Sequence, residues 1–334
     1  MNQELINALN SIVANATPLV IASMGETITE RAGVVNLSLN GSIILSAMAG
    51  FVVALQADSL IIGLIVAILV GALIALIISV ASIELRRDQI AVGFVLTLLA
   101  ADLAQFLGQD FTRVPGPRIS KWSFPILSEI PIIGDIFFDH DVFVYFSFVL
   151  VIAAWFWLFR TRGGLEHRAI GERPESAFAR GTNVNRMRYF YTVFGGGLVG
   201  LAGAAYSLSV KPGWATPPAM QGDGWIALAI VIFGGWHPFR VVFGAYLFAG
   251  LRAASSAIQR NGGLDLPLVD VHVNISFILL NGLPWLLMIL TLLAVSSGGI
   301  ERLVSLLPRQ IQNRMRNVLR SDPPAALGTR FEAE

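Results

Sequence analysis

The sequence contains no cysteine, so disulfide bonds, thiolate metal sites and thiol catalysis are excluded. Charged residues are also scarce: they make up 13% of the 334 residues, whereas 55% are hydrophobic and the mean hydropathy is +0.69. Soluble domains carry about 25% charged residues. The first 24 residues include neither lysine nor arginine, so the charged start of a cleaved signal peptide is missing. This composition predicts a polytopic membrane protein whose first spans direct its insertion.

Motifs for nucleotide binding and metal catalysis are missing as well. No GxxxxGK[ST] pattern occurs, so this chain does not bind ATP through a P-loop. The run 195–200 matches GxGxxG, but that pattern needs a preceding strand and an acidic residue about 20 positions later, and we find neither. We interpret the run as small residues for close helix packing. The four histidines lie in different loops without metal-binding spacing. We therefore expect no cofactor, no metal, no catalytic residues and no nucleic-acid partner.

Long apolar runs recur at the length that a membrane helix needs, about 20 residues. We predict nine spans, within a range of eight to ten, and so an all-α transmembrane bundle over 1–295 followed by a basic tail over 296–334. The first run is the weakest because asparagines and Pro18 interrupt it, and the run 223–236 is short enough to be a broken or re-entrant helix. The predicted spans are 5–24, 37–56, 60–84, 89–108, 142–159, 188–210, 223–236, 240–257 and 274–295.

Positive charge is distributed unevenly between the two sides that this threading creates. One side carries 17 of the 23 lysines and arginines. The positive-inside rule assigns this side, with the tail, to the cytoplasm. It holds the loops 25–36, 85–88, 160–187 and 237–239. The opposite side holds the longest external loop, 109–141, which is rich in proline and aromatic residues.

The loop 160–188 joins two spans with far more residues than a membrane turn needs, and it carries seven arginines. Pro174 suits the first turn of a helix, and Gly181 suits the position just beyond a helix end. We therefore predict one short helix over 174–180, which could dock into a groove on a partner. Its exposed residues would be Ala177, Phe178 and Ala179. The alternative is a solvated basic loop that only fixes the topology.

Several stretches, taken in order, resemble the signatures of one protein family. GETITERAGVVNLSLNGSIILSAMAG (25–50) is similar to its N-terminal signature, and TRGGLEHRAIGERPESAFARGTNVNRMR (161–188) to its coupling loop, with GGGLVGLAGAAYSL in the helix that follows. GDGWIALAIVIFGGWHPFRVVFGAYLFAG (222–250) is similar to its late glycine-rich signature. The family comprises the membrane permease subunits of ATP-binding cassette (ABC) importers for nucleosides and simple sugars, related more distantly to branched-chain amino acid permeases.

This resemblance implies a type II-like ABC importer permease in the bacterial inner membrane, with its C-terminus in the cytoplasm. It also implies a coupling helix near 165–182 that sits in a cleft of a separate ATPase subunit. That subunit would bind the ATP, and its closure would rock the spans. The candidate contacts with the ATPase are Glu172, Pro174, Ala177, Phe178 and Gly181.

Further partners follow from the same resemblance. The short N-terminus is similar to that of the smaller permease in systems that pair two different permease chains, which predicts a heterodimer with a second homologous permease. Substrate would arrive on a periplasmic or lipid-anchored solute-binding protein. The loop 109–141 and the stretch 212–218 are candidate docking surfaces for it, and aromatic anchoring at the membrane interface is the alternative. One departure from the family is Asn40 before Gly41, where relatives often carry glutamate.

Two ionisable residues, Asp102 and Arg252, fall inside predicted spans, where charges usually face a cavity or a partner. We predict that they pair or flank the translocation pathway with Gln105 nearby. A structural ion pair between helices is the alternative. A nucleoside is neutral and rich in hydroxyls, so its path should offer aromatic, amide and hydroxyl groups. The further candidates for the pathway are Asn36, Asn40, Thr97, Trp225 and Asn281.

The tail contains RQIQNRMRNVLR (309–320), a basic stretch with interspersed apolar residues that predicts contact with membrane lipid. After Asp322-Pro323-Pro324 we expect disorder. Two alternative functions stay open: a branched-chain amino acid ABC permease, and a stand-alone secondary transporter or channel that needs no ATPase.

Overall fold

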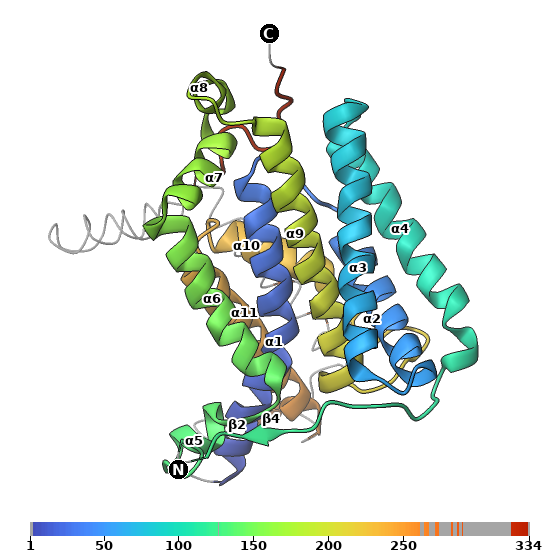
Figure 1. Cartoon of the computed structure of the whole chain (residues 1–334). Coiled ribbons are helices and arrows are strands. Elements are labelled where there is room, and N and C mark those ends of the chain that lie inside the picture. The colour runs from blue at the N-terminus through green and yellow to red at the C-terminus, as the bar shows by residue number, and fades with distance from the viewer. Residues whose placement is uncertain are drawn as a thin grey trace, which may run out of the picture.

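The computed structural model describes residues 3–125, 127–260, 264–266, 271–273 and 322–332, together with 282, 286 and 289. In this part of the chain, seven helices are long and apolar enough to cross a membrane (Figure 1). The predicted all-α transmembrane bundle is therefore confirmed. The long helices are α1 (Gln3–Arg31), α2 (Leu39–Gln56), α3 (Leu60–Ser79) with a π-helical end (Val80–Glu84), α4 (Gln89–Leu107), α6 (Val142–Arg160), α9 (Val184–Ala205) with a π-helical end (Tyr206–Val210), and α11 (Pro238–Arg260).

Shorter elements connect these helices. Two pairs of short strands are antiparallel, β1 with β2 and β3 with β4. The short elements are η2, a 3₁₀ turn (Gln109–Phe111), β1 (Trp122–Ser123), α5 (Ile133–Phe137), β2 (Asp139–His140), α7 (Arg162–Glu172), α8 (Pro174–Ala179), α10 (Asp223–Phe233), β3 (Leu264–Leu266) and β4 (Val271–Val273).

Eight of the nine predicted spans correspond to helices, and the ninth, 274–295, lies outside the described residues apart from three isolated positions. The predicted end of the first span was wrong, because α1 continues from residue 24 to Arg31. The apolar run ends near residue 24 because Glu26 and Glu30 are polar. The helix continues because both side chains are buried against neighbouring elements. The predicted short helix at 223–236 is α10, which is 11 residues long and lies at the middle height of the bundle (Figure 1).

Helix α9 is the centre of the bundle, and it packs against α1, α2 and α3. Its glycines let neighbouring backbones approach closely. A Cβ atom on Gly25 of α1 would lie 2.5 Å from the carbonyl oxygen of Gly195, and one on Gly71 of α3 would collide with the backbone of Gly196 and Gly200. This is close helix packing through small residues. The interpretation of 195–200 as packing residues is confirmed, since the run lies inside α9.

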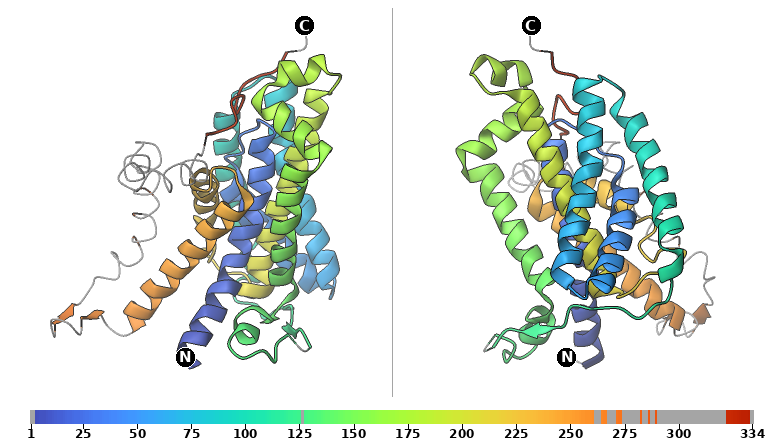
Figure 2. Two further views of the ribbon diagram at one scale, coloured as in Figure 1. Left: turned by 90° about the vertical axis from the view of Figure 1, so that its left-hand side faces the viewer. Right: turned by 45° about the vertical axis from the view of Figure 1, so that its right-hand side comes forward.

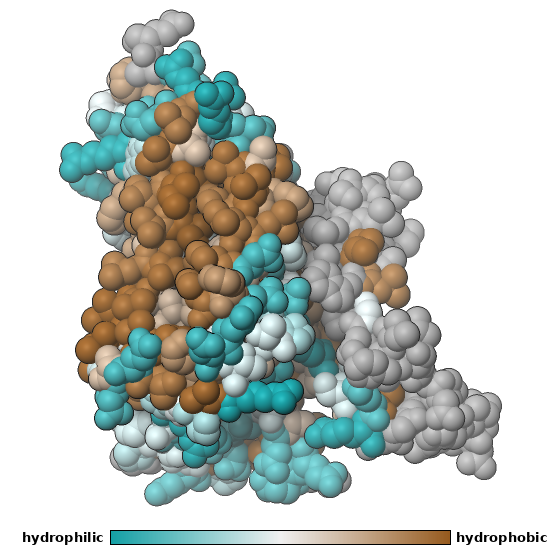
Figure 3. All heavy atoms as spheres, turned by 90° about the vertical axis from the view of Figure 1, so that its right-hand side faces the viewer, coloured by the Kyte–Doolittle hydropathy of each residue, from teal (hydrophilic) through white to brown (hydrophobic). Residues whose placement is uncertain are grey.

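The two long loops lie at opposite ends of the bundle, as the predicted threading requires (Figures 1 and 2). One end carries α7, α8, the turn between α3 and α4, and residues 322–332. The other end carries α5, the β1–β2 pair and the N-terminus. Between the ends, α3 and α4 expose many apolar side chains, including Leu69 and Leu99, each about 60% exposed. Figure 3 shows this broad hydrophobic surface with hydrophilic residues toward the ends. The chain is therefore a multi-pass membrane protein.

Candidate functional site

Helix α10 begins inside the bundle, against the start of α2. Gly222 has a left-handed backbone with φ +92°, and its N–H donates to Oδ1 of Asn40 over 2.9 Å. Gly224 packs so closely that an added Cβ would collide with the backbone of Asn40. An amide oxygen at position 40 thus accepts the hydrogen bond that fixes the entry to α10. At this position a neutral amide therefore fills the role of acceptor.

Thr97 joins the same point from α4. Its hydroxyl donates to the Leu37 carbonyl over 3.0 Å and accepts from the N–H of Gly41 over 3.2 Å. Trp225, in the first turn of α10, is half-buried, and its ring lies 6.2 Å from that of Phe94 on α4. Three predicted pathway residues therefore converge from three helices at the start of α10. These residues are Asn40, Thr97 and Trp225.

The side chain of Asn36 makes its hydrogen bonds within the turn that precedes α2. It is buried, and its Oδ1 accepts from the backbone N–H of Ser38 over 3.1 Å and from its hydroxyl over 2.6 Å. This is a side-chain turn that starts α2. The backbone N–H of Asn36 donates to Oε1 of Glu26 over 3.3 Å, which links the turn to α1.

Arg252 pairs with Asp223, not with Asp102. Its two terminal nitrogens lie 2.6 and 3.2 Å from the two oxygens of Asp223, so the pair is bidentate. The Asp223 side chain is 1% exposed, whereas that of Arg252 is 45% exposed. The predicted pairing with Asp102 is wrong, because the buried carboxylate at the start of α10 takes the guanidinium. The structural ion pair between two helices that we left open is present, but its acidic member is Asp223.

The other predicted pathway residues are not brought into this group. Asp102 is exposed on α4, and the half-buried Gln105 donates a hydrogen bond of 3.5 Å to Ala101 in its own helix. Asn281 lies outside the described residues. The group at the start of α10 therefore consists of neutral polar and aromatic side chains beside one compensated charge pair.

Sequence reasoning missed two acids on α1, Glu26 and Glu30, which are 0% and 4% exposed. Glu30 accepts a hydrogen bond from the indole N–H of Trp236, and Arg31 donates from Nε to the Trp236 carbonyl over 3.1 Å. These bonds tie the end of α1 to the connection between α10 and α11. Their four-residue spacing places both acids on one face of α1, and this pattern could have marked them as a pair.

The loop 160–188 folds into two helices, α7 and α8, where we predicted one. Thr161 caps α7 by accepting from the N–H of Gly164 over 3.0 Å. Pro174 occupies the first turn of α8 as predicted. At the other end, Gly181 has φ +90° and its N–H donates to the Phe178 carbonyl over 2.8 Å. This geometry is a glycine helix stop. The predicted start and stop signals are confirmed.

The exposure of α8 differs from the prediction at one position. Phe178 is 44% exposed and Ala179 is exposed, but Ala177 is only 4% exposed and packs inward with Pro174. The helix is therefore held by the face that carries Pro174 and Ala177, and it offers Phe178 to the outside. The space around Gly181 is open, since no atom lies within 4 Å of an added Cβ.

Helix α7 rests on α1 through His167. This side chain is buried; its Nε2 lies 2.8 Å from the Ile28 carbonyl oxygen, and its ring stacks on Tyr191 at 3.7 Å. Burial, opposed in part by the hydrogen bond to the Ile28 carbonyl and aided by the positive charges of Arg31 and Arg168, lowers the pKa of His167 to about 4. The imidazole is therefore neutral at physiological pH. Nearby, a Glu172 oxygen lies 4.0 Å from Arg31.

Residues 322–332 are ordered against this end of the bundle, so the disorder that we expected after Pro324 was wrong for residues 325–332. The N–H of Ala326 donates to the Gly171 carbonyl over 2.8 Å, and the N–H of Gly328 donates to that of Gly33 over 3.0 Å. Hydrogen bonds to other elements fix the segment, which composition alone does not reveal. The lipid-binding prediction for 309–320 falls outside the described residues.

Among the described residues, no group of three or more histidine, aspartate or glutamate side chains is placed to hold a metal ion. The two candidate functional regions in the described part of the chain are the polar group at the start of α10 and the α7–α8 element at one end of the bundle.

The chain is similar to known proteins along most of its length. A family model described as branched-chain amino acid transport system / permease component matches residues 8–296. The putative glucose ABC transporter permease protein TsgC13 of Haloferax volcanii is 36% identical over 280 residues, which are 80% of this chain and 85% of the relative. No solved structure matches.

Two bacterial relatives show a similar level of identity. The nucleoside ABC transporter permease protein NupC of Lactococcus lactis is 35% identical over 259 residues, 73% of this chain and 81% of the relative. The guanosine ABC transporter permease protein NupQ of Bacillus subtilis is 35% identical over 293 residues, 83% of this chain and 88% of the relative. The same bacteria have a second permease each, NupB and NupP, that is 26% identical to this chain over 103 and 129 residues.

Proposed function

The chain belongs to the family of branched-chain amino acid transport system / permease components, and we propose that it is the permease subunit of an ATP-driven importer. We propose further that this importer carries nucleosides or simple sugars. The observation that carries the proposal is the similarity over most of the chain to permeases named for nucleosides, guanosine and glucose. These substrates share a chemistry, because each is neutral and carries several hydroxyl groups.

The start of α10 supports a neutral substrate. A half-helix that begins inside a membrane bundle is a common place for substrate recognition in transporters. Here it offers the half-buried Trp225, an aromatic surface on which a base or a sugar ring can stack. An amino acid would carry two charges that need partners, but Asp223 and Arg252 already neutralise each other. This favours a nucleoside or sugar over a branched-chain amino acid.

The α7–α8 element supports coupling to a separate ATPase. The sequence has no P-loop, so ATP would be bound by the partner subunit. Phe178 is a partly exposed aromatic residue of the kind that anchors protein interfaces. It lies on the short helix α8, whose buried face carries Pro174 and Ala177. We place this end, with Glu172 and Gly181, in the cytoplasm against the ATPase, because the loops that meet here are rich in arginine.

The remaining subunits follow from the same proposal. NupB with NupC, and NupP with NupQ, are two permeases in one bacterium, which supports a second homologous permease beside this chain. A solute-binding protein would dock at the opposite end, on the loop 109–141 and the stretch 212–218. The assembly would lie in the inner membrane of a bacterium, and substrate would cross by alternating access.

Reconstitution tests the function. The chain would be purified with its second permease and ATPase, placed in liposomes, and supplied with the solute-binding protein and labelled nucleosides, glucose, pentoses or leucine. We expect uptake of a nucleoside or a sugar that requires ATP hydrolysis. Uptake of leucine alone would identify an amino acid permease, and ATP-independent uptake by the isolated chain would identify a stand-alone transporter or channel. Either result would overturn the proposal.

A further inference from the structure

Residues 322–332, here called the C-terminal segment, connect elements that are far apart in the chain. The segment lies across the α7–α8 end of the bundle (Figures 1 and 2). Besides the backbone bonds of Ala326 and Gly328 to Gly171 and Gly33, the N–H of Ala325 donates to Oε2 of Glu172 over 3.2 Å. Pro324 and Ala326 are buried. The segment thus joins α7 to the connection between α1 and α2.

Arg188 is the anchor of this arrangement. It lies in the first turns of α9 and is 2% exposed. Its Nε donates to the Ala32 carbonyl over 3.2 Å, and its Nη1 donates to the Thr329 carbonyl over 2.9 Å. A buried guanidinium is unfavourable unless acceptors satisfy its donors. Nη2 already has no hydrogen-bond partner, so removing the segment would leave Nη1 without its acceptor as well.

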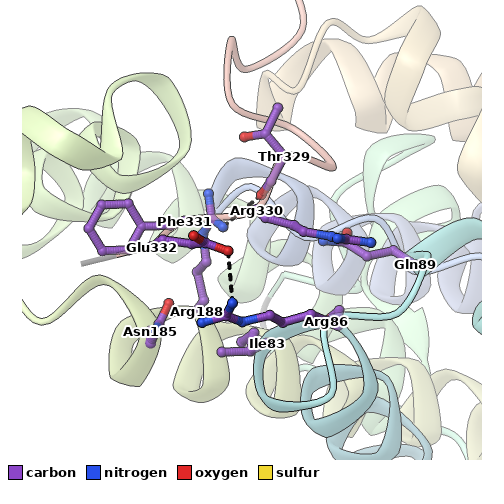
Figure 4. A pocket seen from close by; sticks show the side chains of 10 residues that line it. Ile83, Arg86, Gln89, Asn185, Arg188, Thr329, Arg330, Phe331 and Glu332 are labelled. Atoms are coloured by element: carbon purple, nitrogen blue, oxygen red, sulfur yellow. Dashed lines mark hydrogen bonds and ion pairs between the residues drawn. The ribbon is translucent and has the colours of Figure 1, made fainter. Parts of the chain in front are cut away.

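The far end of the segment reaches α3 and α8. Oε1 of Glu332 lies 3.0 Å from Arg86 in the turn between α3 and α4, as Figure 4 shows. The ring of Phe331 lies 5.6 Å from that of Phe178 on α8. The Arg86–Glu332 pair is more than half exposed on both sides, so it contributes little by itself. The aromatic contact is the direct link to the residue that we expect to face the ATPase.

Resting on the proposed ATPase coupling, we propose that the C-terminal segment is a brace that transmits movement of α7–α8 to the start of α2 and to the α3–α4 turn. Helix α8 has six residues and buries only Pro174 and Ala177, so few contacts hold it on its own. The C-terminal segment contacts the side of α8 through Phe331. It also contacts the residues that follow α1, the α3–α4 turn and α9. It leaves Phe178 44% exposed and the space around Gly181 open. A segment that blocked the docking surface would cover both.

The mechanical part can be tested without any partner. The chain has no cysteine, so spin labels can be attached at Ser176→Cys on α8 and at Arg87→Cys in the α3–α4 turn, both exposed. We expect a narrow distance distribution that broadens when residues 322–334 are deleted. The control pair, Gln56→Cys at the end of α2 with Lys211→Cys after α9, carries both labels at exposed positions away from the segment and should stay unchanged. An unchanged α8 pair would overturn the brace, and so would broadening of both pairs, since that would mean general loosening.

The functional part uses the reconstituted complex. We expect the deletion, and to a lesser degree Phe331→Ala, to lower substrate transported per ATP hydrolysed by about 5-fold or more, with the ATPase still bound. Arg330→Ala, an exposed change in the same segment, is the matched control and should behave like the wild type. Transport above the wild type would identify a blocking segment, and loss of the ATPase would identify a docking surface; either overturns the brace. Absence of ATP-driven transport in the wild type would instead defeat the proposed function, while the spin-label result still decides the mechanical link.

Discussion

The start of α10 and the α7–α8 element hold their residues in different ways. At the start of α10, Asn40, Thr97 and Asp223 are buried and satisfied by groups from other helices. In α8, Pro174 and Gly181 set the start and the end of the helix locally, and the side chain of Phe178 is left 44% exposed. The first group therefore responds to any change in how helices pack, whereas the second can move as a preformed unit. Substitutions at the start of α10 should lower stability, and substitutions on the exposed face of α8 should lower coupling.

The largest loss of stability is expected from Arg252→Met, which leaves the buried carboxylate of Asp223 without a partner. Removing one member of a fully buried ion pair costs about 3–5 kcal/mol. Because the Arg252 side chain is 45% exposed and water screens it, we expect a loss at the lower end of this range, about 3 kcal/mol. Thermal unfolding of the purified protein in detergent would measure it, with exposed Arg260→Met as the control. The double variant Asp223→Leu/Arg252→Met should recover most of the loss. Wild-type stability of Arg252→Met alone would mean that the pair is not a structural link.

Acid should weaken the contact between α7 and α1 through His167. The native pKa of about 4 lies below the ordinary value of 6.5, so the unfolded chain takes up the proton first as pH falls. This contribution to stability is full above pH 6.5 and is lost progressively down to pH 4, by about 3 kcal/mol in total.

The substitution His167→Gln removes this titration. Its unfolding free energy should therefore depend less on pH between 6.5 and 4 than that of the wild type, and chemical unfolding at several pH values would reveal the difference. If the unfolding free energies of the two proteins changed equally with pH, the pKa of His167 would not be lowered in the folded protein, which would contradict the prediction.

Close packing of α9 should be sensitive to a single methyl group. In Gly196→Ala the new Cβ would collide with Ala75 and Gly71, whereas in Gly197→Ala the nearest atom is 3.4 Å away. We expect a loss of about 1–3 kcal/mol for the first and little change for the second. Thermal unfolding of the two variants side by side checks this, and equal stability would contradict the close approach of α3 and α9.

A smaller effect is expected at the end of α8. Gly181→Ala meets no neighbouring atom, so its cost of about 1 kcal/mol comes only from the left-handed backbone. Hydrogen exchange of the α8 amides should become faster while global unfolding is nearly unchanged. Ser176→Ala, on the exposed face of the same helix, is the control. A large drop in global stability would mean that α8 is not an independent unit.

The same contrast explains what the sequence could predict. Helix α8 was placed by Pro174 and Gly181, because these residues restrict or free the backbone locally and need no knowledge of the fold. The spans followed from apolar length. The partner of Arg252 could not be predicted, because Asp223 reaches it only through the packing of α10 against α11. Buried Glu26 and Glu30 were missed for the same reason: their environment is made by Trp236 and Asn36, which are brought to α1 by tertiary structure.

We propose that the α7–α8 element couples ATP hydrolysis by a partner subunit to movement of the bundle. The most direct test is the amount of substrate transported per ATP hydrolysed in the reconstituted complex, compared between Phe178→Ala and Ser176→Ala. We expect Phe178→Ala to leave the chain folded and inserted but to lower this ratio by about 5-fold or more, and Ser176→Ala to keep the wild-type ratio. An unchanged ratio in Phe178→Ala would contradict it and return the element to a loop that only fixes topology.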